Sequence, residues 1–509
     1  MQNIFPKIKM SLFWQTIIVF CISLFLFSLT QFPHTFYDPD GFYHAKISET
    51  IAERGLVKSF PWTQFATLKD GFVDHHLGFH LLIAPLTKIF PSEYALKLGN
   101  LFINSAFVSV FFLFLKKNKI KYSWLFTSFL FLTAPLYARL SMNKAIGLAL
   151  LLLMFFIWAL MAEKKWPLFF ISALFVCSYG GWPISIIVLI CYIVARILFQ
   201  IVENKKMDKK LKNHLLGAAC LTLAGLAAGL VINPYFPQNL NFYWQQVVQI
   251  GLINYQNQLN VGSEWLPYDF ITLAAGTFFL WGILIFSLKA IMDQKAKLNW
   301  RHIFLTFSFI IFFAVTLKSR RYIEYFAPFF ILYIAFLSRE LDLKKLLGGL
   351  GVKMKWFCLS LTALLAGLIL ANFSSTIQIF QTKHSVDKFS GAAAWLAENT
   401  AEGSIVFHTD WDDFPMLWFH NDRNYYIGGL DPTFTYLFNP ELSKKWMSIS
   451  SGSQADELYL IIKNDFQANY VFVEKNNHAL FLNNLENNFL AEKKFEDAES
   501  AIFHLKNND

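Results

Sequence analysis

The sequence predicts a polytopic α-helical membrane protein with a C-terminal α/β domain. Of its 509 residues 55% are hydrophobic and 16% are charged, and the mean hydropathy is +0.40. The charged residues gather between long apolar stretches, as they do when helices cross a bilayer. The last part of the chain is polar and alternates strand-like runs such as "SIVFHT" and "ANYVFVE" with helix-like runs, which is typical of an α/β domain.

About eleven stretches are apolar enough over about 20 residues to be membrane spans. They are 11–32, 98–115, 123–139, 145–162, 166–180, 183–200, 214–232, 270–289, 302–317, 322–338 and 356–372. The first is too long for the apolar part of a signal peptide and lacks a small-residue cleavage site, so we expect it to remain as an anchor. The five cysteines all lie in apolar segments without metal-binding spacing and are expected to be small buried hydrophobes.

Basic residues orient the predicted spans. They cluster in loops that alternate along the chain, so the positive-inside rule places the N-terminus and these loops in the cytoplasm, provided that 77–90 is an interfacial helix. The basic segments are Lys7 with Lys9, 116–121, 163–165, 205–212, 289–301 and 339–355. They also account for the net charge of +9, so we do not expect nucleic acid as a partner.

This topology divides the chain into two predicted domains. Residues 1–372 form the transmembrane domain, with external loops at 33–97 and 233–269, and 373–509 form an extracytoplasmic α/β domain. The absence of a transit peptide favours the plasma (inner) membrane, although the endoplasmic reticulum stays open. Every cluster of polar residues that could form a catalytic or binding site falls on the non-cytoplasmic side. The orientation was assigned from lysines and arginines in other segments, so this convergence is independent support for a site on that side.

Two of these clusters lie in the first external loop. In "YDPDGFYHAKI", Asp40 follows a predicted span, where a carboxylate can hold a cation or act as a general base, or simply cap a helix. In "FVDHHLGFH", Asp74 and His76 have the chemistry of ligands for Mn²⁺ or Zn²⁺, or they belong to a polar interfacial helix.

Three further clusters follow along the chain. Glu264 stands in "NVGSEWLPYD", in the second external loop, either as a functional acid or as a solvated one. Arg320 and Arg321 in "KSRRYIEYFAP" are basic at an external membrane edge, which favours a bound phosphate over a salt bridge to Glu324 or a lipid headgroup. "HTDWDDFPMLWFH" puts acids where a strand ends and a helix begins, either as site residues or as N-caps.

In this order the motifs resemble those of the catalytic subunit of oligosaccharyltransferases, which belongs to the GT-C class of membrane glycosyltransferases. "DGFYHAK" is similar to the family's first acidic motif Asp-Pro-Tyr-Tyr-His-Tyr-Arg, and "VGSEWLP" to its external-loop motif Ser-Val-Ser-Glu-His-Gln-Pro. "RRYIEYFAP" resembles the stretch that contacts the donor phosphate. "DWDDF" partly matches Trp-Trp-Asp-Tyr-Gly, with Trp411 and Asp412 in register.

The resemblance implies a role for each matched residue. Asp40 and Glu264 would be catalytic and would hold a divalent cation, Mn²⁺ or Mg²⁺, with Asp74 and His76 as further ligands proposed from proximity. Arg320 and Arg321 would bind the phosphate of a polyprenyl-linked sugar donor. The acceptor, a protein or lipid that receives the glycan, would contact the chain at Trp411, Asp412 and Asp413.

The sequence also departs from the family. Its second acidic motif, Asp-x-Asp or Asp-Asn-Glu, falls on "RLSMNKAIG", which has no acid, and the first Trp and the Tyr-Gly of the acceptor motif are missing. This puts transfer to protein asparagine in doubt, but not glycosyl transfer. Two alternatives therefore stay open: a monosaccharide transferase acting on a lipid, polysaccharide or Ser/Thr acceptor, and a non-catalytic membrane protein, either a transporter of lipid-linked glycans or an assembly partner. A transporter should show paired repeats or polar midplane groups, which the sequence lacks.

Overall fold

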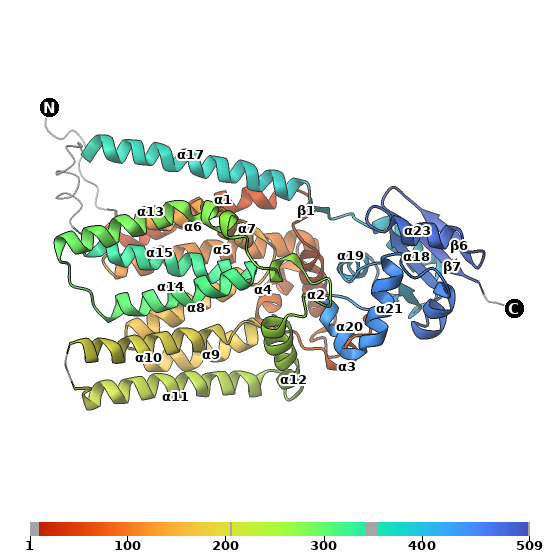
Figure 1. Cartoon of the computed structure of the whole chain (residues 1–509), viewed down its shortest axis with the longest axis horizontal. Coiled ribbons are helices and arrows are strands. Elements are labelled where there is room, and N and C mark those ends of the chain that lie inside the picture. Colours follow the sequence, from red (N-terminus) through yellow and green to blue (C-terminus); the bar gives the residue numbers. More distant parts are fainter. Residues whose placement is uncertain (1–9, 204–205, 342–353, 507–509) are drawn as a thin grey trace. The chain divides into compact units, whose positions relative to one another are not determined.

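The computed structural model describes residues 10–203, 206–341 and 354–506 (Figure 1). Lys7, Lys9, Lys205 and most of the predicted basic loop 339–355 lie outside these residues. The chain divides into two compact units, which are described separately. Unit 1 consists of 1–33, 98–229 and 266–381, and unit 2 consists of 34–97, 230–265 and 382–509. Unit 2 thus combines most of both predicted external loops with the C-terminal segment.

Unit 1 is a bundle of long apolar helices. Within the described residues, seven helices are long and apolar enough to cross a membrane, or eight if a bent pair counts as one span. The seven are α1 (Leu12–Gln31), α5 (Ser92–Lys117), α10 (Ile184–Val202), α11 (Lys209–Ile232), α13 (Phe270–Gln294), α14 (Trp300–Lys318) and Arg320–Arg339, which comprises the 3₁₀ turn η3 (Arg320–Tyr322) and α15 (Ile323–Arg339). The chain is therefore a multi-pass membrane protein.

The other predicted spans are helical but differ from simple crossings. Stretch 123–139 divides at Thr133 into α6 (Ser123–Leu132) and α7 (Ala134–Ser141), because Pro135 has no N–H for a continuous helix and its ring clashes with the preceding turn. α7 and α8 (Ile146–Met161) meet at 113° as the bent pair. α9 (Lys165–Ser178) has only 14 residues, and 356–372 lies inside α17 (Met354–Gln381). Eleven full spans therefore remain a prediction.

α15 is the central helix of unit 1. Every residue from Ile323 to Ser338 is buried, so α15 has no solvent-facing side. A helix that is apolar all round belongs inside a bundle. It packs against α14, α13, α6 and α7, and Figure 1 shows the long helices α13, α14 and α15 running side by side.

Unit 2 is built on a mixed five-stranded sheet of order β4-β3-β5-β7-β6. The strands are β3 (Ile405–Phe407), β4 (Tyr425–Tyr426), β5 (Tyr470–Glu474), β6 (Ala491–Glu496) and β7 (Ser500–Leu505). β3 is parallel to β4 and β5, whereas β7 is antiparallel to β5 and β6. The four runs that the sequence predicts as strands, "SIVFHT", "NYYIGGL", "ANYVFVE" and "AIFHL", are confirmed as β3, β4, β5 and β7. β6 was missed, because its sequence "AEKKFE" is charged, as an edge strand often is.

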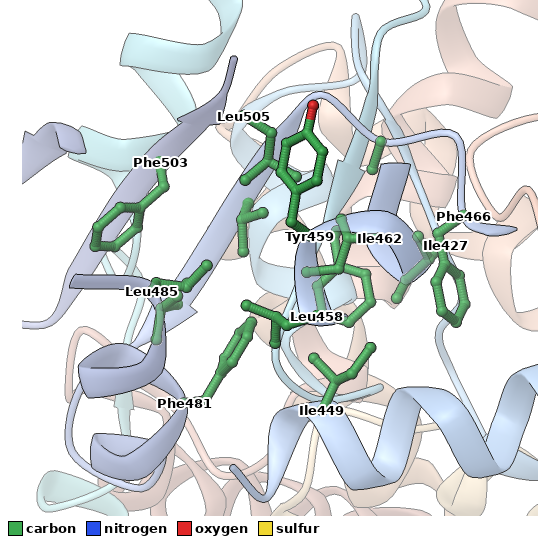
Figure 2. Packing of buried hydrophobic residues seen from close by; sticks show 14 of the residues in the cluster. Ile427, Ile449, Leu458, Tyr459, Ile462, Phe466, Phe481, Leu485, Phe503 and Leu505 are labelled. Atoms are coloured by element: carbon green, nitrogen blue, oxygen red, sulfur yellow. The ribbon is translucent and has the colours of Figure 1, made fainter. Parts of the chain in front are cut away.

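Helices cover both faces of this sheet. α18 (Ser390–Asn399) lies over one face, where Phe389 contacts Phe472 at 4.8 Å between ring centroids. The other face carries α21 (Pro440–Ser450), α22 (Leu458–Leu460), the π-helix η4 (Ile461–Asp465) and α23 (Ala479–Glu486). Figure 2 shows Ile449, Leu458 and Phe481 from three of these helices gathered in one apolar core. The polar tail therefore has a hydrophobic core of its own.

The first predicted external loop is part of the sheet architecture of unit 2. The backbone N–H of Gln64 donates to the carbonyl of Tyr426, and that of Phe65 donates to Ile427, each at 2.8 Å, so this segment lies beside β4. β1 (Thr35–Phe36) pairs with β2 (His384–Ser385) in antiparallel register. The remaining elements are α2 (Asp40–Arg54), α3 (Leu68–Gly71), α4 (Leu77–Thr87), α12 (Gln238–Trp244), η1 (Gln245–Ile253), η2 (Ser263–Trp265), α19 (Asp413–His420) and α20 (Pro432–Phe438).

Candidate active site

Asp40 is the first residue of α2 and is partly buried. The positive end of the helix dipole favours a carboxylate at this position. The next residue must be small, because a Cβ on Gly41 would lie 2.7 Å from the ring of Phe36. α2 then packs on α19, with Phe42 and Phe419 at 5.5 Å between ring centroids. The "DG" pair thus fixes where the helix carrying Asp40 begins, and the aromatic residues after it fix what the helix packs against.

A buried chain of polar side chains links α2 to α4. The carboxylate of Asp74 lies 2.7 and 2.9 Å from Nδ1 of His80, and Nε2 of His80 lies 2.7 Å from Nδ1 of His44. The three side chains are at most 3% exposed. The backbone N–H of His76 also donates to Asp74, at 3.0 Å. This Asp–His–His chain was not predicted, although His44 stands four residues after Asp40 and therefore shares its helix face.

These contacts bear on the predicted metal site of Asp40, Asp74, His76 and Glu264. All four residues belong to unit 2. In the described part of the chain, no group of three or more His, Cys, Asp or Glu side chains is placed to hold a metal ion. The carboxylate of Asp74 already accepts hydrogen bonds from the His80 ring and from the His76 N–H, so its oxygens are engaged within the protein. The divalent cation stays a prediction.

Glu264 lies in the short turn η2, on a loop tied to the rest of unit 2. The side chain of Asn254 donates to the carbonyl of Trp265 at 3.0 Å. From the other side, Nε1 of Trp411 donates to the carbonyl of Asn260 at 2.9 Å. The structure therefore brings together two predicted motifs, "VGSEWLP" and "DWDDF", within one unit.

The acids of "DWDDF" crowd one another at the start of α19. Asp413 is 3% exposed and accepts hydrogen bonds from the Thr409 hydroxyl at 2.6 Å and the Asp410 N–H at 2.8 Å. Burial, then the charge of Asp412, raises the pKa of Asp413 to about 8 and that of Asp410 to about 7. The pKa of Asp412 is also raised, mainly by burial. The carboxyl of Asp413 therefore keeps its proton at neutral pH.

Asp431 is a further acid that sequence reasoning missed. It caps α20 by accepting the Thr433 N–H at 2.8 Å. Burial raises its pKa to about 6, and the charges of Asp40 and Glu264 add to the increase. The two predicted catalytic acids therefore both act on this carboxyl within unit 2. The available sequence signal was "DP", an Asp N-cap followed by Pro at the first helical position.

The predicted phosphate-binding arginines belong to unit 1. Arg320 is exposed, its backbone N–H donates to Leu266 at 3.0 Å, and its Nε donates to Pro267 at 3.1 Å. Arg321 is partly buried. A few residues on, Glu324 forms an ion pair with Arg139 at 2.9 Å. Sequence reasoning considered Glu324 only as a local partner of these arginines, and it gave Arg139 no role.

The fold is that of the GT-C class of membrane glycosyltransferases. The solved structures with this fold include archaeal oligosaccharyltransferase AglB from Archaeoglobus fulgidus, in complex with an inhibitory peptide and a dolichol-phosphate. It has 14% sequence identity and a TM-score of 0.62, over 91% of this chain and 69% of that one. The resemblance inferred from short motifs is thus confirmed at the level of fold.

Two other solved structures share the fold. ArnT from Cupriavidus metallidurans, bound to undecaprenyl phosphate, has 13% identity and a TM-score of 0.57 over 97% of this chain and 98% of that one. Arabinofuranosyltransferase AftD from Mycobacteria has 13% identity and a TM-score of 0.57, and here the chain covers 40% of that protein's length. No protein-family model and no curated protein matches the sequence.

Proposed function

We propose that the chain is a membrane glycosyltransferase that moves a sugar or oligosaccharide from a polyprenyl-phosphate-type donor to an extracytoplasmic acceptor. The observation that supports it best is the fold. Over more than nine-tenths of this chain it resembles two proteins whose structures hold a polyprenyl phosphate, dolichol-phosphate in one and undecaprenyl phosphate in the other. We place the protein in the plasma membrane, with the N-terminus in the cytoplasm and the α/β segment outside it.

In the proposed reaction, the bond between the anomeric carbon and the donor phosphate oxygen breaks as a bond to the acceptor forms. Asp40 or Glu264 orients the acceptor and takes its proton, as a general base must. Arg320 and Arg321 bind the phosphate that leaves with both bonding electrons, and their charge stabilises it. Trp411, Asp412 and Asp413 support the acceptor side. A need for Mn²⁺ or Mg²⁺, with Asp40, Asp74, His76 and Glu264 as ligands, is a separate proposal.

A second candidate is transfer of a single sugar to a lipid, polysaccharide or Ser/Thr acceptor. The hydrogen bonds at the "DWDDF" motif favour it. The indole N–H of Trp411 is bound to Asn260, and the carboxyl of Asp413 is bound to Thr409. Trp411, which is in register with a Trp of the family's acceptor motif, and the acid beside the motif's Asp are therefore both engaged within the protein.

The test is transfer from radiolabelled polyprenyl-linked sugars by the purified full chain, with the labelled product identified. Asp40→Asn should abolish transfer, and Asp38→Asn, two residues earlier in the same turn, is the matched control. An arm with EDTA tests the cation proposal by itself. Equal transfer by the wild type and Asp40→Asn would remove Asp40 from the mechanism. Binding of the donor without any transfer would favour the transporter.

A further inference from the structure

Unit 1 contains a buried charge cluster for which the motifs gave no role. Nη2 of Arg139 lies 2.9 Å from Oε2 of Glu324, and the hydroxyl of Tyr179 donates to Oε1 of Glu324 at 2.9 Å. The three residues are 6%, 1% and 4% exposed, respectively. They come from α7, the end of α9 and the first turn of α15, so one carboxylate joins three helices.

The backbone around Arg139 is held in place by α5. α7 ends at the sharp break before α8, where carbonyls lose their helical partners. The side chain of Asn100 donates to the carbonyl of Met142 at 2.6 Å, and Asn104 donates to that of Leu140. Asn104 has room there only because residue 147 is glycine, since a Cβ would lie 1.9 Å from its Oδ1. The guanidinium of Arg139 therefore projects from a backbone fixed by two asparagines.

Stability alone is a weak reason for such a pair. Burying two charges carries a large desolvation penalty, and apolar residues of similar volume often stabilise a core equally well. A carboxylate whose two oxygens are held by different side chains does, however, fix geometry: Oε2 of Glu324 faces the guanidinium of Arg139, and Oε1 accepts the Tyr179 hydroxyl. The cluster is thus better suited to setting the position of α15 than to holding the bundle together.

α15 follows directly from the turn that carries the arginines. η3 ends at Tyr322 and α15 starts at Ile323, so Glu324 lies three and four residues after Arg321 and Arg320. On the other side, the backbone and Nε of Arg320 are held by the carbonyls of Leu266 and Pro267. The turn is therefore fixed at both ends.

We propose that Arg139 and Glu324 are positioning residues for the phosphate-binding turn: their ion pair holds the start of α15 so that Arg320 and Arg321 meet the phosphate of a polyprenyl phosphate. Tyr179 supports the same carboxylate. This inference rests on the phosphate-binding role of the two arginines in the proposed function. It does not require sugar transfer to take place.

The test is binding of undecaprenyl phosphate to the purified full chain in nanodiscs. Arg139→Gln and Glu324→Gln should each weaken the affinity about 10- to 100-fold, as the loss of a hydrogen bond between charged groups does. The control is Arg196→Gln, which breaks the Arg196–Glu163 ion pair in the same unit and should leave the affinity within about twofold. The exchange Arg139→Glu with Glu324→Arg should restore at least part of the affinity.

Tyr179→Phe covers the case in which Arg139→Gln does not fold. It keeps the ion pair and removes one hydrogen bond, and we expect a smaller loss of affinity, about threefold. The inference is overturned if Arg139→Gln, or Tyr179→Phe in its place, binds as well as the wild type, if Arg196→Gln weakens binding equally, or if the wild type does not bind the lipid. Binding that depends on Arg139 without sugar transfer would sink the proposed function and leave the inference standing.

Discussion

Glu324 in unit 1 and Asp413 in unit 2 are both buried carboxylates, yet their surroundings differ. Glu324 faces the guanidinium of Arg139 at 2.9 Å and the hydroxyl of Tyr179. Asp413 lies among other acids, and its pKa rises to about 8 because it is buried beside Asp412. Unit 1 neutralises its acid with a cation and gains a fixed geometry. Unit 2 brings acids together, so their charge responds to pH and to any ligand that offers positive charge or a proton.

The largest expected effect is on transfer activity and comes from replacing Glu264 in unit 2. Glu264→Gln should lower kcat/KM for sugar transfer about 100-fold or more, as loss of a general base does. Its melting temperature should stay within about 1 °C of the wild type, because Glu264 is only partly buried in a short turn. Transfer kinetics and thermal unfolding of the same preparation check both points. A clear fall in melting temperature would make Glu264 a structural residue, like Glu324.

The same substitution in unit 1 should act on stability. Glu324→Gln leaves the buried guanidinium of Arg139 without its counter-charge, which costs about 3 to 5 kcal/mol. Replacing both partners, with Arg139→Met and Glu324→Leu, should recover most of that loss. Unfolding in a graded denaturant compares the three proteins. A double variant no more stable than Glu324→Gln would mean that the pair stabilises the bundle in its own right.

Most of the contacts that distinguish the two buried acids could not be predicted from the sequence. The composition and the basic loops predicted the helical stretches, since every predicted span is helical. Period and propensity predicted four of the five strands in the large sheet of unit 2, but not the short strands β1 and β2. Asp40 and Glu264 became candidate site residues because they stand in short motifs of recognisable type, and their catalytic roles stay predictions. Arg139 and Glu324 are 185 residues apart, and no local pattern predicts a contact over that separation.

The break in the third predicted span illustrates the same limit. The sequence analysis predicted 123–139 as one uninterrupted span, because apolar composition does not show where a helix breaks and turns. That depends on Asn104 reaching across Gly147 to the carbonyl of Leu140, which is tertiary packing. Likewise, the role of Asp74 as the partner of His80 depends on burial that only the folded loop provides.

The acids of unit 2 predict a stability that falls as pH rises. Asp413 has a pKa near 8 in the folded protein and an ordinary value near 4 when unfolded. Between these values the folded state binds the extra proton, so stability decreases from about pH 4 to about pH 8. Asp413→Asn removes this titration, so relative to the wild type it should gain about 4 kcal/mol between pH 5 and pH 8.5, at about 1.4 kcal/mol per pH unit up to pH 8. Melting temperatures across this range test it. A difference that is constant with pH would show that Asp413 is ionised in the fold.

The smallest expected effect concerns the loop that carries Glu264. Trp411→Phe keeps an aromatic ring but removes the N–H that donates to Asn260, a hydrogen bond worth about 1 kcal/mol. We expect little change in global unfolding and faster hydrogen exchange of residues 254–265, because a loop opens locally once one of its ties is lost. Trp395→Phe on α18 is the control, since that ring contacts Tyr470. If exchange in the loop is unchanged while transfer falls, Trp411 acts on the acceptor, as the family motif implies. If exchange in the loop rises and transfer falls with it, Trp411 affects the reaction by positioning Glu264. Unit 2 would then position its acids through a neighbouring side chain, as we propose that unit 1 positions its arginines.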